Sequence, residues 1–180
     1  AFRVLIAQYS ADIIIFRGMT VLELDRIDLA ILRVLQDAAR IPNAQLAEIV
    51  GLSPSPCLRR VRRLQELGLI RGFATLLDPR RLGLGVNVFV SVTLNDQARS
   101  ELEAFEAQIA GYAEVMECYL MTGDFDYLLR IVATDLDAYQ RFLIEKLTRI
   151  PGVANIKSSF ALKQVIQRHA LPLNHLADLA

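Results

Sequence analysis

The sequence lacks most of the patterns that mark a metal, redox or nucleotide site. Its 180 residues include only two cysteines, Cys57 and Cys118, without a second cysteine or a histidine at zinc or C-x-x-C spacing. Neither a Walker loop nor a dinucleotide-binding glycine pattern occurs. We therefore predict no metal and no cofactor, and we expect both cysteines to be buried, reduced thiols.

Catalytic groups at motif spacing are also missing. The two histidines, His169 and His175, lie near the C-terminus without a serine or carboxylate at catalytic spacing, so we expect them on the surface or in a tail. These absences argue against an enzyme. No apolar run is long enough to span a bilayer, which predicts a cytoplasmic protein with no membrane partner.

The formal net charge of zero hides an uneven distribution of charge along the chain. Residues 19–81 contain ten arginines, no lysine and seven acidic residues, whereas residues 82–180 contain eight basic and twelve acidic residues. This asymmetry suits a phosphate-facing module joined to a module with another task. Residues 1–18 are apolar and precede Met19; we expect an N-terminal appendage or, alternatively, an extra strand or helix that packs on a partner subunit.

Three short helices are predicted in the first half. Asp25 is placed to cap the first, whose apolar and small residues fall at helical spacing: Ile27, Ala30, Ile31, Val34, Leu35 and Ala38. Asn43 is placed to cap a second helix over residues 44–50, and Ser55 and Pro56 to open a third. A tight connector between the second and third helices makes them a helix-turn-helix.

The third helix carries four arginines and only one acid, Glu66. A helical wheel places its apolar residues on one buried face, namely Cys57, Leu58, Val61 and Leu64. The arginines then cover the outer surface, where guanidinium groups suit both phosphate contact and guanine readout. A solvated charged face is the alternative. We predict DNA contacts from Ser53, Ser55, Arg59, Arg60, Arg62 and Arg63.

The second half alternates strands and helices. We expect strands over residues 70–77, 86–94, 115–121, 127–132 and in the final extended segment 153–166. A Ser100–Glu103 capping box opens one helix, and another begins after Asp135. From residue 86 the order is β-α-β-β-α-β, which predicts a ferredoxin-like sheet with two helices on one face and an α+β fold class. Phe89, Cys118 and Phe160 are expected on the other face, where a second copy would bury them in a dimer.

One turn in this half carries polar groups that could hold a zwitterion. It runs from Thr122 to Tyr127 and combines Gly123, whose backbone N–H could face a carboxylate, with Asp124 and Asp126, which could face an ammonium group. An ordinary hairpin turn with solvated acids is the alternative.

Together these segments resemble the leucine-responsive regulatory protein family, the Lrp/AsnC or feast/famine regulators. The resemblance covers Leu24 to about Leu173 and depends on Leu24-Asp25-Arg26-Ile27-Asp28, Leu46-Ala47, Gly51-Leu52-Ser53-Pro54-Ser55-Pro56-Cys57, Thr122-Gly123-Asp124-Phe125-Asp126-Tyr127-Leu128-Leu129 and Ser158-Ser159-Phe160. It implies a winged or plain helix-turn-helix and a sheet domain that dimerises and assembles into octamers. It also implies an effector near the hairpin turn, with leucine or methionine favoured. Residues 1–18 have no counterpart in the family pattern.

We therefore predict a DNA-binding transcription regulator that responds to a small amino acid. The predicted effector residues are Met121, Thr122, Gly123, Asp124, Asp126 and Tyr127. The predicted divisions are an appendage (1–18), a helix-turn-helix domain (19–69), a linker strand and hinge (70–85), and a ferredoxin-like effector-binding and oligomerisation domain (86–180). Two alternatives stay open: an architectural DNA binder with no effector, and the amino-acid-sensing module of a metabolic enzyme.

Overall fold

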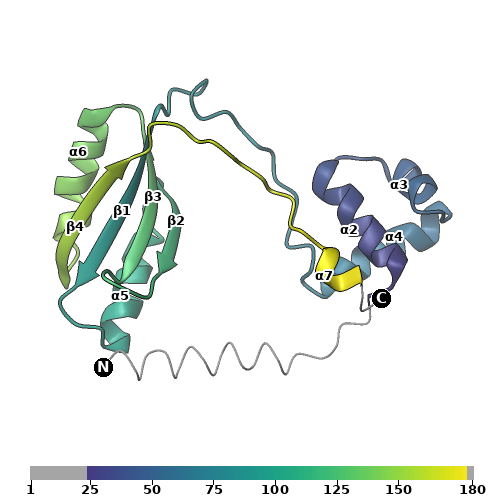
Figure 1. Ribbon diagram of the computed structural model, residues 1–180, viewed down its shortest axis with the longest axis horizontal. Helices are drawn as coiled ribbons and strands as arrows, with labels where there is room; N and C mark the ends of the chain where they lie inside the picture. The colour runs from purple at the N-terminus through teal and green to yellow at the C-terminus, as the bar shows by residue number, and fades with distance from the viewer. Residues whose placement is uncertain (1–23, 178–180) are drawn as a thin grey trace. The chain divides into compact units, whose positions relative to one another are not determined.

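A computed structural model describes residues 24–177 of the chain (Figure 1). The prediction for residues 1–18 lies outside this range. The described chain divides into two compact units, one formed by the residues up to Leu76 together with those from Ile166 onward, and the other by Leu77–Val165. No helix within residues 24–177 is long and apolar enough to cross a membrane.

The first unit contains the predicted helix-turn-helix. Its helices are α2 (Arg26–Asp37), α3 (Asn43–Ile49) and α4 (Pro54–Glu66). Their inner faces form one apolar core, made of Ile31, Leu35, Leu46, Ala47, Cys57 and Leu64. Most positions that the helical periodicity assigned to this core are therefore confirmed. Leu58 is an exception, because its side chain remains 39% exposed.

One of the three predicted helix caps in this unit is confirmed, and the other two are wrong. Asp25 caps α2 as predicted, by accepting a hydrogen bond from the Asp28 N–H. Asn43 is the first residue of α3 and not its cap, and its side-chain amide donates to the carbonyl of Pro54 at 2.8 Å. The N-cap of α4 is Ser53 and not Ser55, because the chain offers two Ser-Pro pairs that fit a helix start and the first is used.

The predicted strand over residues 70–77 is wrong. The segment makes no ladder, and its apolar side chains Phe73, Leu76 and Leu77 are exposed. Its β-forming residues have no partner strand in the described chain, and a strand needs a partner for its backbone groups. The short helix α7 (Asn174–Ala177) lies in the same unit. Shortly before it, the backbone of Leu171 both donates to and accepts from the side-chain amide of Gln36.

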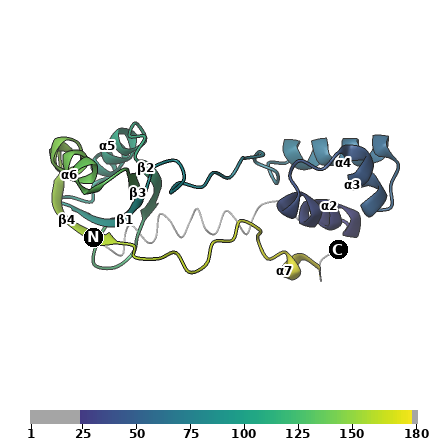
Figure 2. The same cartoon turned by 90° about the horizontal axis from the view of Figure 1, so that it is seen from above.

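The second unit is a four-stranded antiparallel sheet with two helices. Its elements are β1 (Val86–Leu94), α5 (Arg99–Ile109), β2 (Val115–Leu120), β3 (Tyr127–Ala133), α6 (Leu136–Glu145), a short 3-10 turn (Leu147–Arg149) and β4 (Val153–Phe160). The strand order is β2-β3-β1-β4. Figure 2 shows α5 and α6 on the same side of the sheet, so the predicted βαββαβ fold is confirmed.

The register of the sheet decides which side chains face the helices. Val88, Val90 and Val92 of β1 are fully buried beneath α5 and α6, whereas Phe89 lies on the opposite, open face as predicted. The predictions for two other residues are wrong. Cys118 pairs with the buried Leu129, and Phe160 contacts the Tyr139 ring of α6, so both lie on the helix side.

Two smaller predictions in this unit are also corrected. Cys57 is buried as expected, but Cys118 is exposed because β2 is an edge strand. The capping box at Ser100 does not form, because α5 already begins at Arg99 after Ala98. The side chain of Glu103 instead accepts a hydrogen bond from Arg99 at 2.7 Å.

Candidate nucleic-acid interface and effector turn

The outer surface of α4 is the first candidate site. Buried Cys57 and Leu64 hold the helix against the core, so its opposite side faces solvent. Five of the six predicted DNA-contact residues are exposed, namely Ser53, Ser55, Arg59, Arg62 and Arg63. Among the residues that the structure describes, no carboxylate pairs with Arg59 or Arg62.

Arg60 and Arg63 have a different environment from Arg59 and Arg62. The Arg60 guanidinium donates to Asp25 at 2.7 Å and to Asp28 at 2.9 Å. Arg63 donates to the other carboxylate oxygen of Asp28 at 3.1 Å. These contacts link α4 to the start of α2, and they bring together two of the predicted DNA-binding arginines with two acids that our sequence analysis did not assign to the site.

The ion pairs shift the pKa values of both partners. Burial opposes the effect, but the hydrogen bond from the Asp28 N–H, together with the hydrogen bond and charge of Arg60, lowers the pKa of Asp25 below its usual value. Hydrogen bonds to Asp28 and Asp25 raise the pKa of the Arg60 guanidinium in turn. The arginine is therefore charged whenever the unit is folded.

This lowered pKa makes the stability of the first unit depend on pH. Since the folded pKa of Asp25 lies below the unfolded one, its contribution to stability is present above about pH 4 and is lost as the pH falls through the folded value. We expect Asp25→Ser, which keeps a capping oxygen but removes the charge, to lower the urea midpoint at pH 7 and to match the wild type near pH 2. Urea titrations followed by circular dichroism would test this, and an equal deficit at both pH values would contradict it.

The β2–β3 turn is the second candidate site. The Met121 N–H donates to the carbonyl of Asp126 at 2.8 Å and closes the loop. Gly123 has φ of +125°, a conformation that favours glycine. Thr122, Gly123 and Asp124 are exposed at its tip, so their polar groups are open to a ligand.

The other two predicted effector residues point into the protein. The Asp126 carboxylate is buried and accepts from the Leu94 N–H at 2.7 Å and from the Gln97 amide at 2.6 Å. Tyr127 is 1% exposed, and its hydroxyl donates to Glu106 at 2.8 Å. Both side chains therefore fix the turn on β1 and α5, and Asp124 is left as the exposed carboxylate of the turn.

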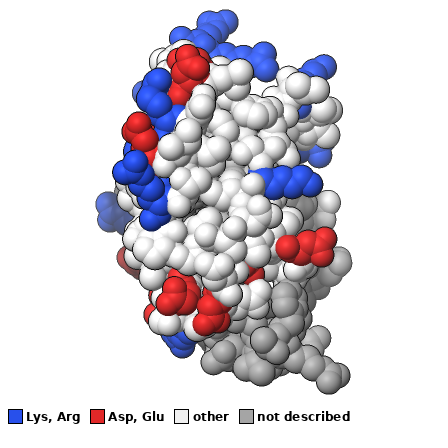
Figure 3. Space-filling view, turned by 90° about the vertical axis from the view of Figure 1, so that its left-hand side faces the viewer, with Lys and Arg blue, Asp and Glu red and all other residues white. Residues whose placement is uncertain are grey.

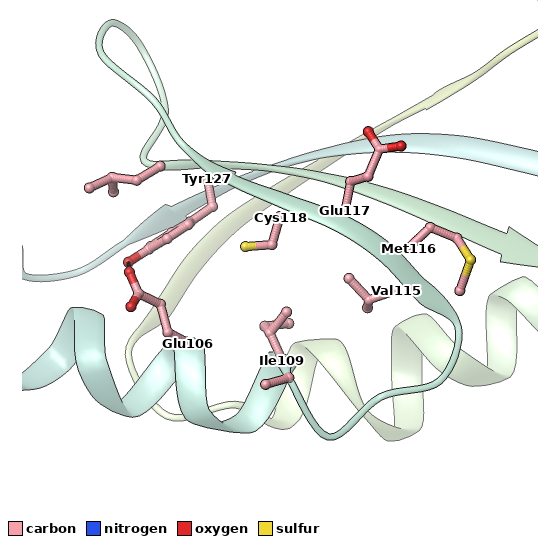
Figure 4. Close-up of a pocket in the computed structure, with 9 residues that line it drawn as sticks. Glu106, Ile109, Val115, Met116, Glu117, Cys118 and Tyr127 are labelled. Carbon is pink, nitrogen blue, oxygen red and sulfur yellow. Dashed lines mark hydrogen bonds between the residues drawn. The ribbon is translucent and has the colours of Figure 1, made fainter. Parts of the chain in front are cut away.

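A recess of about 430 Å³ lies beside this hairpin, between α5 and β2. Its walls include Ile109, Val115 and Tyr127, and Figure 4 shows the Cys118 side chain pointing from the strand toward the helix. Although Cys118 is exposed at the sheet edge, partial burial of its sulfur, with a smaller contribution from the charge of Glu106, raises the pKa of the thiol to about 11. The thiol is therefore protonated and unreactive at neutral pH.

Within residues 24–177, no three histidine, cysteine, aspartate or glutamate side chains are grouped so that they could hold a metal ion. Three residues that contact the candidate sites, Asp28, Gln97 and Glu106, were not predicted from the sequence. Asp28 carried one signal, its spacing of three residues from the Asp25 cap, which is that of a capping box. The long-range partners of the other two have no local sequence signature.

Comparisons with known proteins agree with both halves of this architecture. Residues 24–71 match a family described as winged helix-turn-helix DNA-binding, and residues 87–171 match the Lrp/AsnC ligand binding domain. The described residues of the first unit contain helices but no strand, so a wing is not among them.

Individual relatives cover nearly the whole described chain. The Bkd operon transcriptional regulator of Pseudomonas aeruginosa is 55% identical over 151 residues, which span 84% of this chain and 99% of the relative. The leucine-responsive regulatory protein of Salmonella typhimurium is 45% identical over 149 residues, or 83% of this chain and 91% of the relative. A solved transcriptional regulator from Neisseria meningitidis, in complex with L-methionine, superposes with a TM-score of 0.81 at 42% identity and covers 85% of this chain and 99% of its own.

Proposed function

The chain belongs to the Lrp/AsnC family of DNA-binding transcription regulators, and from this premise we propose that it binds double-stranded DNA through α4 and changes that binding when it takes up a small amino acid. The observation that carries the proposal is the exposed arginine surface on a helix-turn-helix in a chain that also has a ligand-binding domain. We propose no catalytic activity.

The DNA contacts follow from the exposure of α4. In a helix-turn-helix the second helix enters the major groove with its N-terminal residues toward the bases. Ser53 and Ser55 stand at that end and Arg59 and Arg62 follow on the exposed surface, so we propose that the hydroxyls and guanidiniums contact phosphates and base edges. Arg63 is also exposed, whereas Arg60 is half-buried in its ion pairs with Asp25 and Asp28.

The effector is proposed to bind at the β2–β3 turn. The exposed groups of the turn, from Thr122 to Asp124, can pair with both ends of a zwitterion. The recess beside the hairpin has Ile109 and Val115 in its walls together with Glu106 and Glu117, and its apolar part suits an aliphatic side chain. Leucine and methionine fit this chemistry. A leucine-responsive relative and the L-methionine complex of the Neisseria protein support the same choice.

Asp124 offers a direct test of this site. Asp124→Asn keeps the shape of an exposed turn residue but removes the charge that would pair with the ligand ammonium group, so the affinity for leucine or methionine should fall by about tenfold or more. DNA affinity without an effector should not change. Titration calorimetry would measure the first quantity and fluorescence anisotropy the second.

The matched control for this test is Asp137→Asn, which removes an exposed carboxylate from the first turn of α6 in the same unit. It should leave amino-acid binding at the wild-type level. Equal losses in the two variants would point to a general charge effect, and unchanged binding in Asp124→Asn would remove the turn from the effector site.

We also propose that the open face of the sheet forms a homodimer and that dimers assemble further into an octamer. Phe89 lies on this face, next to the paired Glu117 and Arg130, and both helices α5 and α6 of the unit lie on the other face. Figure 3 looks onto the β4 and α6 side of the unit, where much of the surface in view is uncharged. Sedimentation velocity would reveal the assembly, and a monomer at micromolar concentration would contradict it.

Two other functions make different predictions. An architectural DNA binder would bind DNA without any response to amino acids. The sensing module of a metabolic enzyme would bind an amino acid but not DNA. Arg59 and Arg62 are exposed and have no carboxylate partner among residues 24–177, which favours DNA binding over the second of these.

A further inference from the structure

Asp28 is a buried carboxylate at the first turn of α2. Its side chain is 1% exposed, whereas the side chain of the neighbouring Asp25 is 51% exposed. A buried carboxylate is costly unless it is paired, because it has lost its hydration. Both oxygens of Asp28 are paired, one with Arg60 and the other with Arg63, so the two guanidiniums compensate the charge.

The spacing along α4 separates its arginines into two stripes. Residues three apart lie on the same side of a helix, so Arg60 and Arg63 form one stripe and Arg59 and Arg62 the other. The first stripe reaches α2, where Arg60 pairs with Asp25 and Asp28, and Arg63, whose side chain is still 46% exposed, pairs with Asp28. The second stripe is exposed and has no carboxylate partner among residues 24–177.

Moving Arg60 onto a DNA phosphate would be unfavourable in this arrangement. Its guanidinium holds two carboxylates at once, with a side chain that is only 29% exposed. If it left, Asp28 would keep the longer contact to Arg63 and the 3.4 Å hydrogen bond from the Asp25 N–H but would lose its shortest ion pair, and the phosphate would add another negative charge nearby. The physical cost therefore favours an Arg60 that stays on α2 while the other stripe meets the DNA.

We propose that Asp28 is a positioning residue that holds Arg60, and through it the orientation of α4, so that Arg59 and Arg62 make the phosphate contacts and Arg60 makes none. The inference rests on the proposed function of α4 as the DNA-facing helix. It narrows the set of contacts predicted from the sequence, in which all four arginines were equivalent.

The salt dependence of DNA binding separates a positioning arginine from a contacting one. Each phosphate contact adds about 0.9 to the slope of log K against log salt, so one arginine lost from both subunits of a dimer should reduce the slope by about 1.8. We expect Arg59→Gln to show this reduction with unchanged stability. Arg60→Gln should leave the slope within about 0.5 of the wild type and lower the urea midpoint instead.

A double-mutant cycle tests the link to Asp28. Asp28→Asn keeps the shape of the side chain, and Arg60→Gln should cost much less stability in that background than in the wild type. Arg60→Lys should recover part of the midpoint lost in Arg60→Gln, because it restores the charge. The salt-slope experiment uses Arg60→Gln alone, so it remains decisive if Asp28→Asn does not fold.

The outcomes distinguish this inference from the function it rests on. If Arg60→Gln reduces the slope as much as Arg59→Gln at unchanged stability, Arg60 contacts phosphate and the inference is wrong. Stability losses that add fully in the double variant would also overturn it. If the wild-type protein shows no salt-dependent DNA binding at all, the proposed function itself fails.

Discussion

Replacing Arg59 and Arg62 together by glutamine should weaken DNA binding by about 100-fold or more at moderate salt, which is the largest functional effect we expect from any exposed pair. Each dimer would lose four guanidiniums, and with them about 3.6 from the slope of log K against log salt. The fold should be unaffected, since both side chains are exposed and neither has an ion-pair partner within residues 24–177. Fluorescence anisotropy with a labelled duplex at several salt concentrations would measure both quantities.

The control for this pair is Arg33→Gln with Arg40→Gln. These two arginines are exposed in the same unit but lie outside α4, so the double variant changes the net charge equally. Its DNA affinity should fall only slightly. If it falls as much as that of the α4 variant, DNA binding reflects the charge of the unit as a whole and not a contact surface on α4.

The largest stability effect is expected at Leu64, whose side chain is fully buried where α4 meets the core of the first unit. Leu64→Ala should lower the free energy of unfolding of that unit by about 2–5 kcal/mol, through lost apolar contact and the cavity that remains. DNA binding should disappear with it. The second unit has its own core around β1 and β3, so we expect leucine or methionine to bind the variant as it binds the wild type.

Leu58→Ala provides the comparison on the same helix. Its side chain is 39% exposed, so the loss should be below about 1 kcal/mol. Urea titrations would measure the loss of stability in both variants, and titration calorimetry would measure whether they still bind leucine or methionine. If Leu64→Ala also abolished amino-acid binding, the two units would not fold independently.

The fold could be predicted to a large extent because its signals are local. The helical spacing of Ile31 and Leu35 and the alternation of Val88, Val90 and Val92 each depend on a few neighbouring residues, and both patterns produce the expected buried faces. Helix starts were less predictable. The chain offers two Ser-Pro pairs, and the local sequence alone does not distinguish Ser53, which precedes the helix, from Ser55.

The candidate site was less predictable because it depends on partners distant in sequence. The four α4 arginines are equivalent in the sequence, and only the position of α2 beside them shows that Arg60 pairs with Asp25 and Asp28. Similarly, the sequence does not distinguish Asp124 from Asp126 in the turn, but in the structure the Asp126 carboxylate accepts hydrogen bonds from the Leu94 N–H and the Gln97 amide. The face on which Cys118 lies followed from the register of β2 against β3, which the strand pattern of β2 alone does not determine.

The central claim is that an amino acid bound at the second unit changes DNA binding by the first. The most direct measurement is the affinity of the full chain for a duplex from its own upstream region, with and without saturating leucine or methionine, together with sedimentation velocity under the same conditions. We predict that one of these amino acids changes the affinity by about fivefold or more and shifts the assembly. DNA binding that stays the same with every amino acid would contradict the claim and leave an architectural DNA-binding protein.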